Sequence, residues 1–212
     1  MVTDGLSPIT VLLFLGLLLG SLALLVGALA ALLLKSALWA RRFLLLEAAG
    51  LGVYAALYLL AALTSHDRSL DPGEEKHICE IDCHLAYTVV GVRPAKTWGD
   101  REANGTFYIV TVRVRFDSAT ISSSRPRTAP LTPNRRVVAI VDGQGHRYPA
   151  PVDALRRTLL PGEAYTTQFV IDVPTTATGL RLVLANDDWE SRFLIGHENS
   201  WLHGKTTFRL GT

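Results

Sequence analysis

Both cysteines of the chain lie in one short segment that also carries two histidines. Thiol and imidazole groups in this arrangement could form a disulfide, hold a metal ion or attach a haem. Two further histidines lie just before the last apolar strand that the sequence predicts. The residues concerned are His77, Cys79, Cys83, His84, His197 and His203.

We favour a structural disulfide between Cys79 and Cys83. The segment follows two predicted membrane spans and is expected outside the cytoplasm, where disulfides form and persist. Two cysteines four positions apart can close a small loop where the local geometry allows it. Because the loop is short, the expected stabilisation of the fold is small. This interpretation predicts that the protein carries no cofactor.

A copper site is the alternative that would give these residues a function. Thiolates and imidazoles together suit copper, and zinc after it. The cysteines enter the first predicted strand of a β-domain, and the two later histidines enter its last strand. If these two strands run side by side and parallel, the ligands gather at one end of the domain, near the bilayer. The candidate ligands are Cys79, Cys83, His84, His197 and His203.

The same segment also has the form of a haem-attachment motif. Cys79, Cys83 and His84 read C-x-x-x-C-H, one residue longer than the usual C-x-x-C-H. The extra residue changes the spacing of the two sulfurs, and no cytochrome-like helices follow. Covalent haem is therefore the third interpretation.

Two long apolar runs precede this segment and must place it relative to a membrane. Residues 9–34 contain no ionisable side chain, and residues 43–64 contain one. A helix of about 26 residues rises roughly 39 Å, enough to cross a hydrocarbon core of about 30 Å. We therefore predict a two-helix transmembrane hairpin over residues 1–64.

The basic residues of this hairpin predict its orientation. Lys35, Arg41 and Arg42 lie between the two runs, whereas the N-terminal segment carries only Asp4. Lys and Arg collect in cytoplasmic loops, so the turn is predicted in the cytoplasm and both termini outside an inner (plasma) membrane. A cleaved signal peptide is disfavoured, because it needs a basic start and a shorter apolar core.

Two sets of residues bear on partners in or beside the membrane. Glycines at positions 16, 20 and 27 form a small-residue stripe that allows close helix approach. The stripe fits packing against the second helix of the hairpin, or against a helix of another protein. Trp98, Trp189 and Trp201 lie in predicted loops, where we expect packing at the core edge; an aromatic surface patch is the alternative.

The composition of the remaining chain excludes some functions. The protein has 21 Lys and Arg against 19 Asp and Glu, and the residues after position 64 are nearly neutral. Nucleic-acid binding needs a basic face, so we expect no nucleic-acid partner. Arginine outnumbers lysine 17 to 4, which favours a bacterial source.

The chain from residue 77 onward predicts an all-β domain. Residues 106–116 and 165–173 alternate apolar and polar side chains with a period of two, as half-buried strands do. Asp142-Gly143-Gln144-Gly145 predicts a hairpin. Six or seven such strands predict an immunoglobulin-like sandwich over residues 77–212, after a polar juxtamembrane linker at residues 65–76. Residues 122–136 contain three prolines and predict a long exposed loop.

The strand order resembles an immunoglobulin-like domain of unknown function found in many bacterial lipoproteins and membrane-anchored exported proteins. The resemblance covers roughly residues 85–186. It implies a fold and a membrane-anchored setting, and it implies no catalytic residue because the family shares no catalytic motif. The segments that carry it are 108–114, 141–148, 160–163, 169–174 and 180–184.

The hairpin followed by an extracytoplasmic β-domain also resembles subunit II of haem–copper oxidases. The copper motif of that family reads C-x-E-x-C-x-x-x-H and is followed by a methionine. Cys79 and Cys83 match its cysteines, but Glu80 is one place early and position 87 is Tyr. Only the two cysteines are carried over as implied copper ligands.

Together these features predict a non-catalytic integral membrane protein. Its extracytoplasmic sandwich would act as a binding or accessory module for a membrane or envelope protein partner, with the lipid bilayer as its other partner. The alternative is a copper-binding, electron-transfer or copper-handling protein that uses the cysteine and histidine residues.

Overall fold

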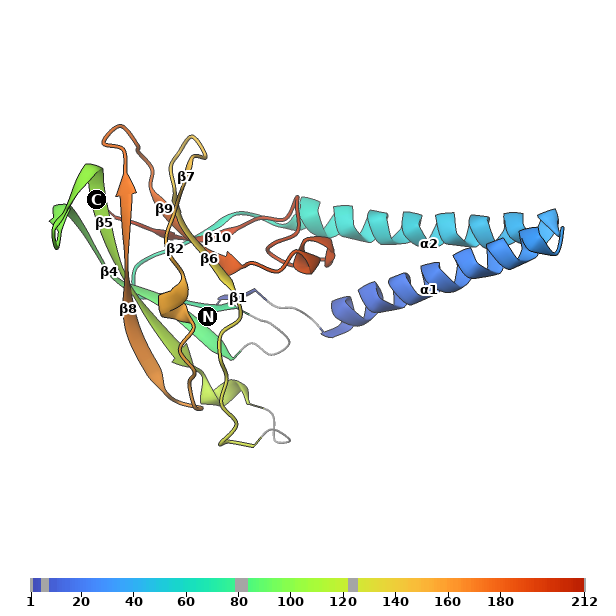
Figure 1. Cartoon of the computed structure of the whole chain (residues 1–212), viewed down its shortest axis with the longest axis horizontal. Coiled ribbons are helices and arrows are strands. Elements are labelled where there is room, and N and C mark those ends of the chain that lie inside the picture. The colour runs from blue at the N-terminus through green and yellow to red at the C-terminus, as the bar shows by residue number, and fades with distance from the viewer. Residues whose placement is uncertain (1, 5–7, 79–83, 122–125, 212) are drawn as a thin grey trace. The chain divides into compact units, whose positions relative to one another are not determined.

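The computed structural model describes residues 2–4, 8–78, 84–121 and 126–211, in which two long helices precede most strands of two β-sheets (Figure 1). The helices are α1 (Pro8–Leu33) and α2 (Ala37–Thr64). The strands are β1 (Val2–Asp4), β2 (Arg68–Leu70), β3 (Glu75–Ile78), β4 (Leu85–Trp98), β5 (Arg101–Phe116), β6 (Arg136–Val141), β7 (Arg147–Pro149), β8 (Ala164–Val173), β9 (Arg181–Asn186) and β10 (Thr206–Arg209). Short 3-10 helices lie at η1 (Ser118–Thr120), η2 (Asp153–Leu155) and η3 (Glu190–Phe193).

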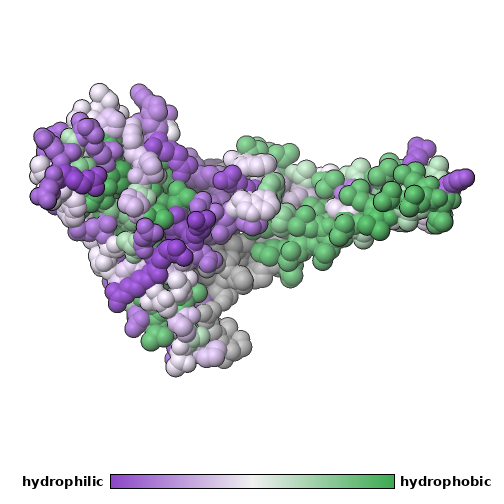
Figure 2. Space-filling model, viewed as in Figure 1, coloured by the Kyte–Doolittle hydropathy of each residue, from purple (hydrophilic) through white to green (hydrophobic). Residues whose placement is uncertain are grey.

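The two helices form the hairpin that the apolar runs predict. With 26 and 28 residues, α1 and α2 rise about 39 and 42 Å, so each can span a hydrocarbon core of about 30 Å. Lys35 in the turn has a φ of 55°, and the N–H of Ser36 donates to the carbonyl of Ala31 at 2.8 Å. This hydrogen bond ends α1 with a Schellman-type turn. Apolar residues cover the helices, and polar residues lie at their turn (Figure 2).

Small residues bring the helices together near the turn. A Cβ on Gly27 would lie 3.3 Å from the ring of Phe43, and Ala28, Ala31 and Ala40 are buried. Gly27 therefore serves the internal packing of the hairpin. The same holds for neither Gly16 nor Gly20, because no atom lies within 4 Å of the position of a Cβ at either residue.

The β-domain is a sandwich of two five-stranded sheets. One sheet has the order β1-β3-β4-β5-β8 and the other β2-β10-β9-β6-β7. Most neighbours are antiparallel, whereas β1 pairs with β3 and β2 pairs with β10 in parallel. The alternation predicted for β5 is confirmed at Val110, Val112 and Val114, which are buried in the core while Arg113 is exposed. A helical hairpin followed by a β-sandwich is thus confirmed as the fold class.

The core between the sheets contains two buried cations. Lys76 is fully buried, and its Nζ donates to the carbonyls of Leu184 and Thr206 at 2.8 and 2.9 Å. Arg136 is also buried, and it donates to Tyr87 at 3.1 Å and to the side-chain oxygen of Asn186 at 2.6 Å. Both charges therefore have hydrogen-bond acceptors, as buried ionic groups require.

The structure differs from the predicted linker over residues 65–76. Arg68–Leu70 forms β2, and β3 begins at Glu75. Because β2 is an edge strand that pairs only with β10, its two polar side chains stay exposed while Leu70 is buried. A polar sequence at an edge thus forms a strand without an alternating apolar signal.

Other segments follow the prediction closely. The Asp142–Gly145 turn joins β6 to β7 as a hairpin, and its Asp142 side chain accepts from the N–H groups of Gln144 and His146. Of the loop predicted over residues 122–136, residues 122–125 lie outside the described residues. Residues 126–135 contain one isolated bridge, between Leu131 and Leu159, and no strand, whereas Arg136 is the buried first residue of β6.

The chain divides into two compact units, each described by itself. One unit is the sandwich. The other contains both helices and also residues 190–203, which we name the cap segment. The predicted sandwich range, 77–212, included this segment. It packs on the helices instead, because its aromatic side chains and carbonyl groups find partners on α1 and α2.

Candidate functional site

The predicted cysteine and histidine site lies partly outside the described residues. Cys79 and Cys83 fall in residues 79–83, so both the disulfide and the metal interpretation stay predictions. Among the described residues, no three side chains of His, Cys, Asp or Glu come together as metal ligands would. The candidate ligand His84 lies in the sandwich unit, whereas His197 and His203 belong to the cap segment.

A charged network positions both ends of the cysteine segment. His77 is fully buried, and its Nε2 lies 3.3 Å from the Asp117 carboxylate. The backbone N–H of Asp117 donates to the carbonyl of His84 at 2.7 Å. Arg115 donates to Glu75 through Nε and Nη2 at 3.1 and 2.8 Å, and its Nη1 lies 3.2 Å from Asp117. Asp117 thus contacts His77 through its carboxylate and His84 through its backbone N–H.

The network keeps its carboxylates ionised. Hydrogen bonds from Arg115 are the main cause that lowers the pKa of Glu75. For Asp117, burial would raise the pKa, but hydrogen bonds from the Ala119 N–H, Arg115 and His77 outweigh it and lower the pKa. Sequence analysis missed these three charged residues. The signal available was the placement of Glu75 and Arg115 at polar positions of two strands.

His84 is fixed by packing and one hydrogen bond. It is 3% exposed, its Nδ1 lies 2.6 Å from the Thr120 hydroxyl, and its ring stacks on Phe116 with centroids 5.4 Å apart. These contacts hold the His84 side chain against Phe116, the last residue of β5.

His197 and His203 shape the turns of the cap segment. His197 is 5% exposed, and its Nδ1 accepts from the backbone N–H of Asn199 at 2.9 Å. The backbone N–H of Ser200 donates to the carbonyl of His197, and that of His203 donates to the carbonyl of Ser200. The hydrogen bond to Nδ1 leaves that nitrogen unsuited to binding a metal in this conformation.

Two tyrosines of α2 hold the cap segment on the helices. Tyr54 donates to the carbonyl of Phe193 at 2.7 Å, and Tyr58 donates to the carbonyl of Arg192 at 2.8 Å. The Tyr58 hydroxyl also accepts from the backbone N–H of Trp201 at 2.9 Å. These three hydrogen bonds join residues more than 130 positions apart in the sequence.

Ring contacts extend this attachment to α1. Phe193 stacks on Phe14 with centroids 6.4 Å apart and planes 8° apart. Trp201 meets the Phe193 ring edge-on at 5.1 Å. Offset and edge-on aromatic pairs each stabilise by about 0.5–1.5 kcal/mol beyond the area they bury. Both helices are therefore tied to one C-terminal segment.

The aromatic residues of α2 lie at two levels separated by the thickness of a hydrocarbon core. Trp39 near the turn pairs with Phe43 at 6.1 Å, and Arg42 lies 4.9 Å from the centroid of the Trp39 ring. Tyr58 lies 19 positions further along the helix, about 28 Å at 1.5 Å per residue. Trp and Tyr concentrate at the two membrane–water interfaces, about 30 Å apart.

The exposure of two tryptophans differs from the expected core-edge packing. Trp189 in the sandwich unit and Trp201 in the cap segment are 62% and 63% exposed, and Leu202 is 63% exposed. The Trp201 ring uses one edge against Phe193 and leaves the rest uncovered. The alternative prediction, an aromatic surface patch, fits the exposure of Trp201 better, and Leu202 extends this exposed apolar surface.

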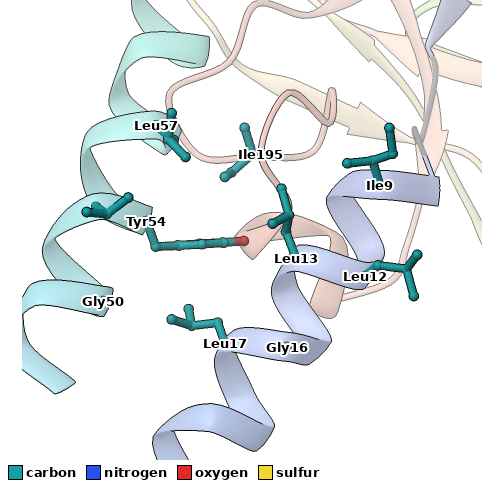
Figure 3. A pocket seen from close by; sticks show the side chains of 10 residues that line it. Ile9, Leu12, Leu13, Gly16, Leu17, Gly50, Tyr54, Leu57 and Ile195 are labelled. Carbon is teal, nitrogen blue, oxygen red and sulfur yellow. The ribbon is translucent and has the colours of Figure 1, made fainter. Parts of the chain in front are cut away.

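A hollow lies between the two helices at the ends away from their turn (Figure 3). We name it the outer groove. Its volume is about 430 Å³, within the range of about 300–1,000 Å³ typical of ligand pockets. Gly16 and Gly50 leave it open, and Tyr54 and Ile195 reach into it. Its lining residues are almost all aliphatic: Ile9, Leu12, Leu13, Gly16, Leu17, Gly50, Val53, Tyr54, Leu57 and Ile195.

Comparison with known proteins gives structural matches of low sequence identity. No family model matches the chain, and no curated protein sequence matches it. The secreted protein MPT63 of Mycobacterium tuberculosis is 13% identical, with a TM-score of 0.43 over 69% of this chain and 99% of its own. The yjhA protein of Bacillus subtilis is 15% identical, with a TM-score of 0.38 over 67% and 99%. A conserved hypothetical protein of Bacillus anthracis is 17% identical, with a TM-score of 0.35 over 54% and 93%.

Proposed function

We propose that the chain is an integral inner-membrane protein that presents its β-sandwich outside the cytoplasm as a non-catalytic binding or accessory module. The observation that carries this proposal is the pair of bare helices. Each is long and apolar enough to cross a membrane, and neither buries its apolar window inside the protein. A soluble helix of this composition would be covered by the core, so the bilayer is the partner that fits.

Two features support an orientation with both termini outside. The turn carries Lys35, Arg41 and Arg42, and Lys and Arg near membrane spans favour the cytoplasmic side. In addition, β1 at the N-terminus pairs with β3 of the sandwich. A chain that crosses the membrane twice brings these two strands to the same side, as the pairing requires.

The aromatic levels support a specific depth in the bilayer. The hydrocarbon core would extend from Trp39 to Tyr58 on α2. The cap segment, which is fixed to Tyr58 and Tyr54, would then lie at the outer interface with Trp201 and Leu202 exposed to the headgroups. Tryptophan and tyrosine rings are stable there because one part is apolar and the other polar.

The test uses the full-length protein in the inner membrane of a bacterial host. We expect it to remain in the membrane after alkaline carbonate washing. In spheroplasts, trypsin added outside should cleave the sandwich at the exposed Arg127 and Arg135 and leave the turn at Lys35 intact. Release by carbonate, or digestion only after the membrane is opened, would refute the proposed location or orientation.

The partner is expected to contact the sandwich. A photo-reactive amino acid at the exposed Arg113 on β5 should yield one discrete cross-linked product in living cells if this sheet face is bound. The matched position is the exposed Arg147 on β7, in the other sheet. The same cross-linked product at both positions would contradict a specific binding face. The absence of any cross-linked product at several positions on each sheet would contradict a binding module altogether.

Copper handling remains the second candidate because of one observation beside the cysteines. His77 lies two positions before Cys79, and its Nδ1 atom is buried with no hydrogen-bond partner among the described residues. This nitrogen could therefore act as a further copper ligand. The test is metal analysis and thiol titration of the full chain, purified anaerobically with and without copper. Bound copper with two free thiols, lost in Cys83→Ser, would support this function. Absence of both metal and free thiols would establish the disulfide.

A further inference from the structure

The outer groove lies at the depth of the outer half of the bilayer. Gly50 and Leu57, which line it on α2, are 11 and 18 positions beyond Trp39, or about 16 and 27 Å of helix rise. With the inner interface at Trp39, both positions fall in the outer leaflet. This depth rests on the membrane position proposed above.

The chemistry of the groove suits an acyl chain. Its one side-chain hydroxyl, that of Tyr54, already donates to the carbonyl of Phe193. A polar ligand group would therefore be buried there without a ready partner, at a cost in free energy. A flexible hydrocarbon chain needs no partner and can follow the hollow that Gly16 and Gly50 leave between the helices.

A cation lies in the cap segment three positions before Ile195, which lines the groove. Arg192 directly precedes Phe193, whose carbonyl accepts from Tyr54, and its own carbonyl is held by Tyr58 at the outer interface. Its side chain is exposed, and it makes no ion pair within the part of the chain that the structure describes. A guanidinium group binds phosphate through two parallel hydrogen bonds.

From this arrangement we propose that the outer groove binds one phospholipid of the outer leaflet, with an acyl chain between α1 and α2 and its phosphate beside Arg192. The charge of the headgroup phosphate makes the site prefer a phospholipid over an uncharged lipid. Lipid tails and the groove are equally apolar, so burial alone does not distinguish a bound chain from the surrounding bilayer.

A helix of another protein is the competing occupant, and the structure favours it less. A helix with its side chains is about 10–12 Å wide, and one crossing the whole bilayer would have to continue past Ile195 of the cap segment. An apolar helix would also leave the charge of Arg192 without a partner. Gly20, the other open glycine of the α1 stripe, does not line the groove.

The chain offers matched variants for a test. No atom lies within 4 Å of a Cβ placed at Gly16, Gly20, Gly50 or Gly52, so a leucine meets no immediate neighbour at any of them. Gly16→Leu and Gly50→Leu fill the groove. Gly20→Leu and Gly52→Leu add the same side chain to the same helices outside it.

The measurement is native mass spectrometry of the full-length protein in mild detergent, titrated with dioleoyl phosphatidylglycerol or with uncharged dioleoylglycerol. We expect one phosphatidylglycerol per chain, bound about tenfold more tightly than dioleoylglycerol because of the charged hydrogen bonds. Gly16→Leu and Gly50→Leu should each weaken binding about fivefold or more, since the groove becomes overfilled. The two control leucines should leave it unchanged.

A second pair of variants tests the headgroup contact. Arg192→Gln should remove the preference for phosphatidylglycerol over dioleoylglycerol, and Arg147→Gln on the sandwich should retain it. Equal lipid binding by wild type and both groove variants, unsaturable binding, or a shift from dimer to monomer in Gly16→Leu without loss of lipid would overturn the proposal.

Carbonate washing of the same membranes separates the two proposals. A wild-type chain that is washed out would refute the membrane location itself. A chain that stays in the membrane but binds no lipid in the titration would refute only the lipid site.

Discussion

The attachment of the cap segment to α2 gives a graded prediction. Tyr54→Phe removes one hydrogen bond, to the carbonyl of Phe193, whereas Tyr58→Phe removes two, to the carbonyl of Arg192 and from the N–H of Trp201. Each intramolecular hydrogen bond contributes about 1 kcal/mol net. We therefore expect opening of the cap segment to become easier by about 1 kcal/mol in the first variant and about 2 kcal/mol in the second.

Hydrogen exchange measures this opening directly. The backbone N–H of Ser200 donates to the carbonyl of His197 inside the cap segment, so its exchange reports the opening of that segment. When local opening limits exchange, the rate follows the opening equilibrium. Peptides over residues 194–203 should then exchange about 5-fold faster in Tyr54→Phe and about 30-fold faster in Tyr58→Phe.

The control is Tyr108→Phe in β5, a tyrosine of the sandwich unit, which should leave exchange in residues 194–203 unchanged. The full-length protein in detergent or nanodiscs serves for all three variants. Equal exchange in wild type and Tyr58→Phe would refute the attachment. Faster exchange in Tyr54→Phe than in Tyr58→Phe would refute the count of hydrogen bonds on which the magnitudes rest.

Three further predictions concern the sandwich. Gly105→Ala should lower Tm by several degrees, because a Cβ there would clash with the carbonyl oxygen of Val173 and overpacking costs about 1–3 kcal/mol; the control Gly91→Ala, whose nearest atom is 3.9 Å away, should leave Tm nearly unchanged in the same thermal melts. Arg115→Gln should reduce the loss of stability in acid. Arg115 lowers the pKa of Glu75, so the stabilisation is complete above a pH of about 4.3 and is lost as pH falls, and denaturant titrations at pH 7 and pH 3.5 measure the difference. Burial raises the pKa of Tyr165 to about 12, so stability should fall as pH rises from about 10 towards that value, and Tyr165→Phe should reduce this alkaline loss in melts between pH 8 and pH 11.

The strands that follow a period of two could be predicted from the sequence, because one face of each is covered by the opposite sheet. Val110, Val112 and Val114 are examples, since each is completely buried. Lys76 is also fully buried, but it carries a charge and its neighbours His77 and Ile78 are buried too, so no alternation marks β3 and the sequence predicts a polar linker there. The burial of Lys76 depends on the carbonyl groups of Leu184 and Thr206 in the other sheet. Both acceptors lie more than 100 positions away in the sequence, so no local sequence pattern predicts them.

The cap segment could not be predicted for a similar reason. Its residues are mixed in polarity, and their position after β9 suggested a loop of the sandwich. What fixes them is the pair of hydroxyl groups on α2, Tyr54 and Tyr58, which an analysis of apolar runs treats as ordinary members of a span. The exposed tryptophan at position 201 was the available signal that this loop meets an interface.

The division of the chain into two units has a consequence for its synthesis. Residues 190–209 supply the cap segment to the helices and β10 to the sandwich, so both units depend on one continuous stretch of the chain. Because translation adds about 5–20 residues per second, the cap segment is synthesised several seconds or more after the helices that it packs on. A chain that stops at residue 189 would lack β10, which lies between β2 and β9, and would present an unpaired edge of β9 that invites aggregation. Termination before residue 190 would thus leave both the helical unit and the sandwich incomplete at once.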